Sequence, residues 1–270
     1  MSINEEHATS FGQVADRYDR VRPGPPAAAV DWLVPDGCRA AVDLAAGTGL
    51  FSRALLGRVP RVTAVEPDPR MREVLARRSP GLDVRDGRGE AMPLPDGGAD
   101  AVFVSTAWHW LDLPLAVPEI ARVLRPGGRL GVIWTSRNRD EDWVAELDLL
   151  RPDGGTRGTA DSVRAYLDRH NTVTLPDGAA FGAAETASFT FSRTMPVTDV
   201  LDWLATSSNV ITASAAGREA GLARCLAALL GRAGRQAGAA GPVIEMPMRS
   251  WCWRAERSPA APAGTRWQDG

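Results

Sequence analysis

The chain has 270 residues, with 31 basic and 33 acidic side chains and a formal net charge of −2 at pH 7. It contains neither a basic block nor an apolar run of the ~20 residues that a membrane-spanning helix needs, so we expect neither nucleic acid nor a membrane as a partner. All 31 basic residues are arginines, which excludes Schiff-base and pyridoxal phosphate chemistry, because both need a lysine.

The N-terminal part, residues 1–36, is expected to form lid helices. Apolar side chains recur at Phe11, Tyr18 and Val21, a spacing typical of a helix. The pattern stops before a proline cluster, which cannot continue a helix. We therefore expect a helix that begins near Phe11 and ends at Val21.

The first residues and the cysteines bear on location and redox state. Residues 1–7 lack the basic-then-apolar pattern of a secretory signal, which predicts a cytoplasmic location. Cys38, Cys225 and Cys252 are far apart and form no C-x-x-C motif. Neither a zinc site nor a disulfide framework is indicated, and no metal is expected.

An apolar run that meets an acid and then two closely spaced glycines is the most informative feature of the chain. Residues 41–49 read AVDLAAGTG, which predicts a strand that turns sharply into a helix. Glycine at Gly47 and Gly49 permits positive φ and lets a ligand approach the backbone closely. The carboxylate of Asp43 would repel a pyrophosphate and attract an ammonium group. We therefore expect a nucleotide-type cofactor that carries a positive charge.

A second acid follows the next apolar run. Residues 61–65 are expected to form a strand, and Glu66 stands at its end. A carboxylate in this place can accept two hydrogen bonds from ribose hydroxyls. We therefore expect Asp43 and Glu66 to contact one ligand.

The segment from residue 37 to residue 135 is interpreted as a cofactor-binding core. Short apolar strands, including those expected at residues 99–104 and 130–134, alternate with helices, as a parallel sheet covered on both faces requires. These helices are expected over residues 51–56, 70–78 and 115–124.

The alternation of short apolar strands with helices ends after the core. Residues 136–186 are interpreted as a cap insertion with a short polar helix over residues 161–170, and residues 258–270 as a disordered tail. Residues 187–257 are expected to supply the last strands and the helices of the substrate pocket. The strands are expected at residues 187–193 and 246–254, and the helices at residues 197–207 and 218–230.

Four motifs in order resemble the class I S-adenosylmethionine-dependent methyltransferases. The VDLAAGTG run ending at Gly49 resembles their first motif, and VTAVEPDPRM around Glu66 resembles the acidic end of their second strand. Residues 88–95, RGEAMPLP, resemble the loop that packs on adenine, and residues 123–130, VLRPGGRL, complete the set. The resemblance implies an α/β Rossmann-like fold with a seven-stranded, mainly parallel sheet whose last strand is antiparallel, plus a helical cap.

The resemblance also implies which residues hold S-adenosylmethionine. Asp43 would face its amino group, and Glu66 would bind its ribose hydroxyls. The backbone from Gly47 to Gly49 would pass under its methionine part. The implied cofactor contacts are Asp43, Ala45, Gly47, Thr48, Gly49, Glu66, Pro67, Met71, Gly89, Glu90, Ser105, Tyr18 and Arg22.

A looser resemblance to the small-molecule branch typified by trans-aconitate-type methyltransferases implies the acceptor side. There Tyr18 and Arg22 would cover the cofactor or meet the substrate, or else only pack and form salt bridges. His109, just after the fourth strand, is the candidate general base, with a structural hydrogen-bonding role as the alternative. The candidate substrate contacts are Phe11, Tyr18, Trp108, Trp110, Trp143 and Trp203, although large aromatic side chains also fill cores.

We therefore expect methyl transfer to a small molecule, with oxygen favoured over carbon or nitrogen, in secondary metabolism, by a monomer or homodimer. One alternative uses the same cofactor for cyclisation or decarboxylation. A nicotinamide-dependent oxidoreductase is disfavoured by Asp43 and by Ser52, which stands where a third glycine would be needed. A protein that binds the cofactor without turnover is the third alternative.

Overall fold

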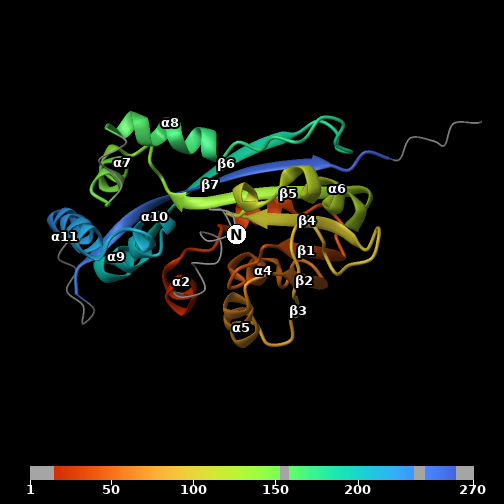
Figure 1. The fold of residues 1–270 in the computed structure, drawn as a ribbon, viewed down its shortest axis with the longest axis horizontal. Helices are drawn as coiled ribbons and strands as arrows, with labels where there is room; N and C mark the ends of the chain where they lie inside the picture. The colour runs from red at the N-terminus through yellow and green to blue at the C-terminus, as the bar shows by residue number, and fades with distance from the viewer. Residues whose placement is uncertain (1–14, 153–157, 234–240, 260–270) are drawn as a thin grey trace, which may run out of the picture.

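The computed structural model describes residues 15–152, 158–233 and 241–259, and these form one sheet with helices on both faces (Figure 1). The strands are β1 Ala40–Leu44, β2 Arg61–Val65, β3 Asp83–Arg85, β4 Ala99–Ser105, β5 Leu124–Arg137, β6 Glu185–Pro196 and β7 Val243–Glu256. Their order in the seven-stranded sheet is β3-β2-β1-β4-β5-β7-β6. The last strand, β7, is antiparallel to both of its neighbours, and the other pairs are parallel. The expected Rossmann-like architecture is confirmed.

Most helices fall close to where the sequence predicts them, whereas the helices at residues 142–149 and 208–211 were not expected. They are α2 Ala15–Val21, α3 Ala27–Leu33, α4 Leu50–Leu55, α5 Pro69–Arg78, α6 Leu113–Val123, α7 Asp142–Leu149, α8 Ala160–His170, α9 Val197–Ala205, α10 Ser208–Ile211 and α11 Ala215–Arg232. The expected helix start at Phe11 lies outside the described residues, as does the tail from residue 260 onwards. No helix in the described ranges is long and apolar enough to cross a bilayer.

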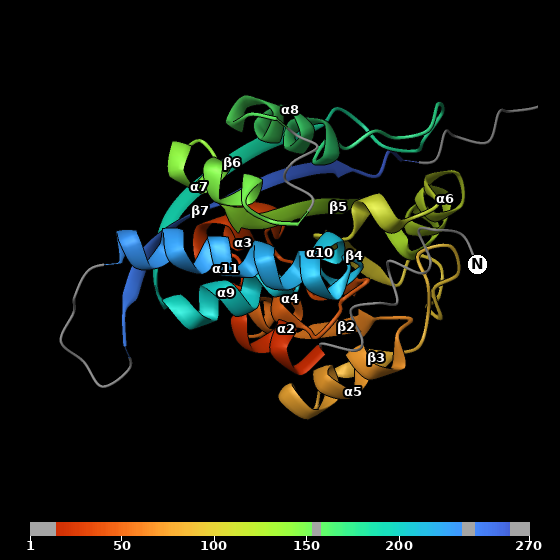
Figure 2. The ribbon, with the colours of Figure 1, turned by 60° about the vertical axis from the view of Figure 1, so that its left-hand side comes forward.

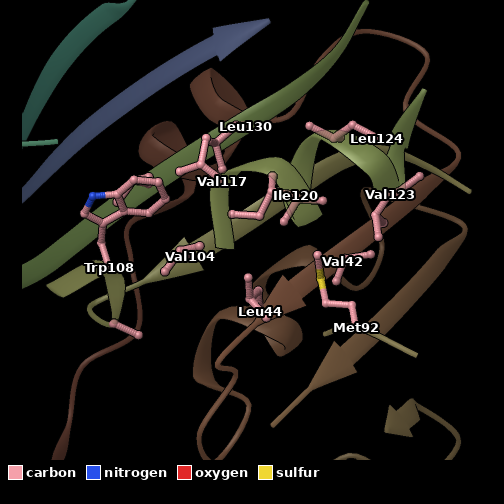
Figure 3. Packing of buried hydrophobic residues seen from close by; sticks show 14 of the residues in the cluster. Val42, Leu44, Met92, Val104, Trp108, Val117, Ile120, Val123, Leu124 and Leu130 are labelled. Carbon is pink, nitrogen blue, oxygen red and sulfur yellow. The ribbon is translucent and has the colours of Figure 1, made fainter. Parts of the chain in front are cut away.

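The strands of the core place alternate side chains on the two faces of the sheet. Val42 and Leu44 of β1 belong to the hydrophobic cluster with α6, whereas Ala41 belongs to the cluster with α3 and α4. Val104 and Phe103 of β4 divide in the same way. Figure 3 shows the α6 side, where side chains of the helix meet those of the strands. Both faces are therefore buried, and the loops at the carboxyl edge remain for function.

A second helical layer is carried by β5, β6 and β7, the longest strands of the sheet. Helices α7, α9 and α11 pack there around a third hydrophobic cluster that includes Leu147, Val200, Trp203 and Leu229. Figure 2 shows α9 and α11 side by side with α2 below them. Helix α2 contacts both α9 and α5. It therefore bridges the second helical layer and the core.

Candidate active site

The turn after β1 lies at the centre of the sheet, because β1 pairs with β2 on one side and β4 on the other. Ala45, Gly47 and Gly49 all have positive φ, at 55°, 58° and 85°. A Cβ on Gly49 would lie 2.9 Å from Cγ of Leu75, so this glycine permits close packing of α5. A Cβ on Gly47 would meet nothing within 4 Å. Among the described residues, space therefore remains next to the backbone at Gly47.

Asp43 is fully buried at the end of β1. Its Oδ2 accepts a hydrogen bond of 2.6 Å from Oγ of Ser52, whereas its Oδ1 is buried and has no hydrogen-bond partner among the described residues. Burial raises the pKa of this carboxyl from 3.8 to about 7, against the opposing hydrogen bond from Ser52. An unsatisfied buried acceptor is costly. A cationic amino group would satisfy Oδ1 and favour the ionised carboxylate.

Glu66, at the end of β2, is brought directly to the turn after β1. Its Oε2 accepts from the backbone N–H of Gly47 at 2.8 Å, and its Oε1 accepts from that of Asp68 at 2.9 Å. Burial raises the pKa of this carboxyl. Each carboxylate oxygen keeps a further lone pair. Glu66 therefore ties two turns together and retains acceptors for a pair of hydroxyl groups.

Thr48 links the same turn to the N-terminal helix. It is 1% exposed, and its Oγ1 is buried with no hydrogen-bond partner in the part of the chain that the structure describes. Its carbonyl accepts from Nη1 of Arg53 at 2.8 Å, and Nη2 of Arg53 pairs with Asp19 of α2 at 2.5 Å. Arg78 also pairs with Asp19 at 3.5 Å. These contacts join α2 to the turn after β1 through Arg53.

Two expected contacts after β2 have different surroundings. Pro67 is exposed, whereas Met71 is 5% exposed and packs with Ala15 of α2 and Val74. The neighbouring Asp68 caps α5, accepting from the backbone N–H of residues 70 and 71. Met71 therefore holds α2 against α5.

The loop after β3 is anchored beside the end of β4. Gly89 is buried, and a Cβ there would lie 2.7 Å from Cδ2 of Leu111. Oε1 of Glu90 accepts from the backbone N–H of Asp112 at 3.0 Å. Ser105, which ends β4, is half-buried. Packing thus explains the glycine at position 89, and the loop lies against the start of α6.

Trp108, His109 and Trp110 form the 3₁₀ helix η2 directly after β4. Trp108 is 2% exposed and belongs to the core cluster, where Figure 3 shows it beside Val104 and Leu130. His109 and Trp110 are half-buried, with ring centroids 4.4 Å apart. The structure therefore places Trp108 in the core and keeps the other two aromatic side chains nearer the surface.

Tyr18 and Arg22, which were expected to belong to the lid, lie together at the end of α2. The guanidinium of Arg22 lies 4.4 Å over the ring of Tyr18 and donates to Oγ1 and the carbonyl oxygen of Thr206, at 3.2 and 3.1 Å. This group therefore joins α2 to the end of α9. Phe11 lies outside the described residues.

Trp143 and Trp203 both belong to the second helical layer. Trp203 is 3% exposed in its hydrophobic cluster, with the guanidinium of Arg137 at 4.8 Å from its ring. Trp143 is half-buried against the same cluster and is covered by Arg232 at 4.4 Å. Both rings therefore make packing contacts within the second helical layer.

Arg53 and Asp19 were not predicted from the sequence as part of the site, and Ser52 was considered only as the place of a missing glycine. Arg53 and Asp19 are 34 positions apart in the chain. Nothing in the local pattern distinguishes them from charges on a solvated helix face. Ser52 stands one turn into α4 and nine residues after Asp43, which its hydroxyl contacts.

Comparisons with known proteins give this geometry a family. A family model described as a methyltransferase domain matches residues 42–132. An uncharacterized methyltransferase of Mycobacterium tuberculosis is 40% identical over 207 residues, which are 76% of this chain and 79% of that protein.

Two solved structures share the fold. One, assigned as a type II methyltransferase of Anaeromyxobacter dehalogenans, has a TM-score of 0.63 at 24% identity and covers 88% of this chain and 99% of its own. The other is phosphoethanolamine N-methyltransferase 2 of Haemonchus contortus, solved with phosphomonomethylethanolamine and S-adenosylhomocysteine. Its TM-score is 0.51 at 12% identity, over 92% of this chain and 58% of that one.

The site agrees with the cofactor of this family. The unsatisfied Oδ1 of Asp43 suits an amino group, the open backbone at Gly47 admits a ligand, and Glu66 offers acceptors to ribose hydroxyls. The comparisons do not favour a nicotinamide-dependent oxidoreductase. The chain belongs to the class I S-adenosylmethionine-dependent methyltransferases, and S-adenosylmethionine is its cofactor.

Proposed function

We propose that this methyltransferase modifies a small molecule in secondary metabolism and that the methyl group goes to an oxygen atom. S-adenosylmethionine supplies the methyl group as a sulfonium electrophile. The chain therefore has mainly to bind and align the two reactants, and the absence of a catalytic triad is no obstacle. Residues 136–186 would serve as the cap over the acceptor, and the helices within residues 187–257 would help to close its pocket.

The cofactor side of the proposal rests on the turn after β1. Asp43 would pair with the amino group, Glu66 would accept from the ribose hydroxyls, and the backbone from Gly47 to Gly49 would lie under the methionine part. We further assign cofactor contacts to neighbours that the sheet gathers at the same edge. These neighbours are Ala45, Thr48, Pro67, Gly89, Glu90 and Ser105.

The acceptor side rests on one observation, the position of His109. It follows the end of β4, and β4 pairs directly with β1, whose end carries Asp43. Its ring lies against Trp110, so the two side chains form a half-buried aromatic surface next to the cofactor turn. An imidazole in this place would take the proton of an acceptor hydroxyl. Trp110 and Tyr18 are the aromatic residues that we assign to the acceptor.

The proposal is tested with S-adenosylmethionine whose methyl group carries deuterium. The protein is incubated with panels of phenols, alcohols, carboxylic acids and amines, and products are analysed by mass spectrometry with fragmentation. We expect a product that gains one labelled methyl group on oxygen. A product changed in structure without the label would indicate a cyclising or decarboxylating enzyme instead, and label on nitrogen or carbon alone would overturn the choice of oxygen.

A further inference from the structure

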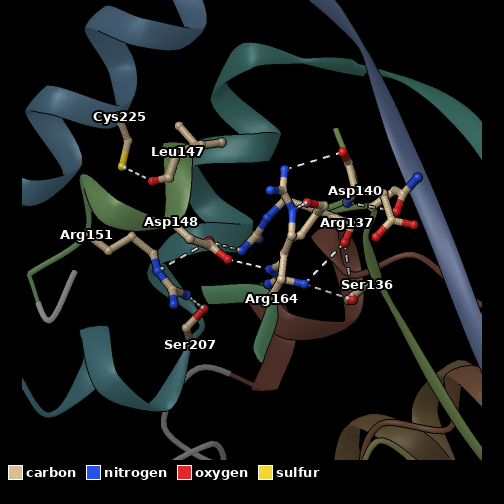
Figure 4. Close-up of polar contacts among 11 residues, drawn as sticks. Ser136, Arg137, Asp140, Leu147, Asp148, Arg151, Arg164, Ser207 and Cys225 are labelled. Carbon is tan, nitrogen blue, oxygen red and sulfur yellow. Dashed lines mark hydrogen bonds and ion pairs between the residues drawn. The ribbon is translucent and has the colours of Figure 1, made fainter. Parts of the chain in front are cut away.

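A buried group of arginines surrounds one carboxylate where β5 meets α7. Nη2 of Arg137 lies 2.7 Å from Oδ1 of Asp148, and Nε of Arg151 lies 3.5 Å from the same oxygen. Nε of Arg139 pairs with Oδ2. The side chains of Arg137, Arg139 and Arg151 are 3%, 12% and 6% exposed, and that of Asp148 is 1% exposed. Figure 4 shows Arg137 and Arg151 on either side of Asp148. We call these four residues the arginine cluster.

Within the described ranges, the charges of the arginine cluster do not balance. Three guanidinium groups face one carboxylate, and in the described residues none of the three forms an ion pair with any other acid. The nearby acids are used elsewhere, since Asp140 pairs with Arg249 at 3.0 Å and Asp142 pairs with Arg164 at 2.6 Å. Buried charge without a partner is costly. The cluster therefore favours a further anion.

The hydrogen-bond donors of the cluster are also incompletely used. Among the described residues, Nε of Arg137 and Nε of Arg151 are buried without a hydrogen-bond acceptor, although Nε of Arg151 lies 3.5 Å from Oδ1 of Asp148. Burial lowers the pKa of Arg137 to about 9, opposed by Asp148 and reinforced by Arg139 and Arg151. Guanidinium groups present several N–H donors that match the oxygens of a carboxylate or phosphate. A carboxylate or a phosphate would therefore both accept from these donors and balance the excess positive charge.

The arginine cluster lies on the side of the sheet where we propose that the acceptor binds. Ser105, at the end of β4, pairs with Ile133 of β5, and Arg137 stands four residues further along β5. At ~3.3 Å per residue, this places the backbone of Arg137 roughly 13 Å beyond the end of β4. Arg151 donates to Oγ of Ser207 at 3.2 Å, next to Thr206, which accepts from Arg22, the residue after α2. The cluster therefore lies beyond the carboxyl edge of β4 and is joined to the lid.

We propose that Arg137, Arg139 and Arg151 bind an oxyanion, a carboxylate or a phosphate, carried by the methyl acceptor at the end remote from the reacting oxygen. Asp148 holds the three guanidinium groups together and leaves the excess positive charge for the ligand. This proposal rests on the proposed function, since it assigns a substrate class to the same enzyme. It predicts an acceptor longer than a single small ring.

The test measures anion binding without requiring turnover. Sodium hexanoate and hexyl phosphate are titrated calorimetrically into the wild-type protein with saturating S-adenosylhomocysteine, at constant ionic strength set with sodium chloride. Hexanamide is the neutral probe of matched length. We expect hexanoate, hexyl phosphate or both to bind, and hexanamide to bind at least about tenfold more weakly. The difference between the two anions identifies which oxyanion the cluster prefers.

Variants then locate the binding. Arg151→Gln and Arg139→Gln each remove one charge of the cluster, and each should weaken the anion about tenfold or more. Arg58→Gln is the matched control, because it removes the same charge from an exposed pair with Asp31 of α3 and should leave anion binding unchanged. Two cluster variants are used so that the test survives if one of them does not fold, which circular dichroism and S-adenosylhomocysteine binding report.

The outcomes separate this proposal from the proposed function. If neither anion binds better than hexanamide, or if both cluster variants bind the anion like the wild type, the arginine cluster is only a structural link between β5 and α7. S-adenosylhomocysteine binding and label transfer are measured separately, so a failure of the methyl-transfer assay leaves the anion result standing. Anion binding that is lost in the cluster variants alone supports the proposal.

Discussion

At the scale of single residues, the turn after β1 depends on two buried carboxyl groups with different partners. Glu66 is satisfied by backbone N–H groups of Gly47 and Asp68, whereas Asp43 has Ser52 on one oxygen and nothing on the other. The raised pKa of Asp43 follows mainly from its burial. The protonation of Asp43 is therefore coupled to whatever cation lies next to it.

Cofactor affinity should rise with pH because Asp43 must ionise to pair with an amino group. With a pKa of about 7, the ionised fraction grows about eightfold between pH 6 and pH 7.5. We expect the dissociation constant for S-adenosylhomocysteine to fall by a similar factor in calorimetric titrations. Asp43→Asn should bind more weakly and with little pH dependence, which separates the effect from Glu66. A flat wild-type profile would contradict this role.

The same group makes folding stability depend on pH. The carboxyl of Asp43 has a pKa of 3.8 when unperturbed and about 7 in the folded chain, so between these values the folded state holds a proton that the unfolded state has lost. The contribution of Asp43 to stability is therefore most favourable below pH 3.8 and declines as the pH rises towards 7. Urea unfolding should show that Asp43→Asn removes part of the decline measured for the wild type between pH 5 and pH 8.

His109 offers a second test at this scale. A general base speeds reaction of a neutral hydroxyl but not that of an acceptor already ionised. We expect His109→Asn to lower kcat for an alcohol or weakly acidic phenol by about 10²- to 10⁴-fold, and to change kcat for a carboxylate little. Equal losses for both kinds of acceptor would indicate that His109 only supports the structure around η2.

At the scale of elements, α2 joins the core to the second helical layer. Asp19 binds Arg53 and Arg78 on the core side, and Arg22 binds Thr206 on the layer side. Arg20 also pairs with Asp202 of α9. Since Arg53 holds the carbonyl of Thr48, the position of α2 is transmitted to the cofactor turn.

Loosening α2 should therefore weaken cofactor binding. Asp19→Asn removes a carboxylate that is 8% exposed and has two arginine partners, and we expect a loss of about 1–3 kcal/mol in S-adenosylhomocysteine affinity. Hydrogen exchange of the backbone amides of α2 should become faster. Asp16→Asn is the control, because its pair with Arg77 is exposed and should contribute less than about 1 kcal/mol. Equal effects of the two substitutions would refute the link.

Helices and strands were predictable from the sequence where local patterns are strong. The alternation over residues 187–193 and the motif around Gly47 and Gly49 gave elements that the structure contains. The start of β5 was not predicted correctly, because the strand begins at Leu124 and not at residue 130. Its first residue pairs with Ala99 of β4, and the register then shifts at a β-bulge that the local sequence pattern does not indicate.

Side-chain partners were much less predictable than elements. Trp108, Trp143 and Trp203 were expected at the acceptor, but an aromatic residue carries no sign in the sequence of whether it faces a core or a ligand. The arginine cluster was also missed, since Arg137 and Asp148 lie on different elements and only the fold brings the two side chains together. The charged residues of the sequence do not show which of their side chains lie close together in the fold.

At the scale of the whole molecule, the buried hydrophobic residues form a sheet core and a separate cluster in the second helical layer. The sheet core, with α3, α4 and α6, fixes the ends of β1, β2 and β4, where the proposed cofactor residues stand. The second helical layer has its own cluster, built from α7, α9 and α11 on the extended strands. We therefore expect substitutions in the second cluster to affect stability more than cofactor affinity.

Trp203→Ala tests this division. Trp203 is 3% exposed within the second cluster, so its loss should lower the free energy of unfolding by about 3–5 kcal/mol. S-adenosylhomocysteine affinity of the folded fraction should stay within about twofold of the wild type, since no cofactor residue belongs to this cluster. Leu230→Ala, at a side chain that is 48% exposed on α11, should cost less than about 0.5 kcal/mol. A stable Trp203→Ala variant that fails only in methyl transfer would instead make Trp203 an acceptor contact.

The most direct test of the central claim is a calorimetric titration of the wild-type protein with S-adenosylmethionine, S-adenosylhomocysteine and NADH. The geometry of Asp43, Gly47 and Glu66 predicts micromolar binding of the first two and no binding of NADH. Binding of NADH alone, or of none of the three by folded protein, would contradict the assignment of this turn to S-adenosylmethionine.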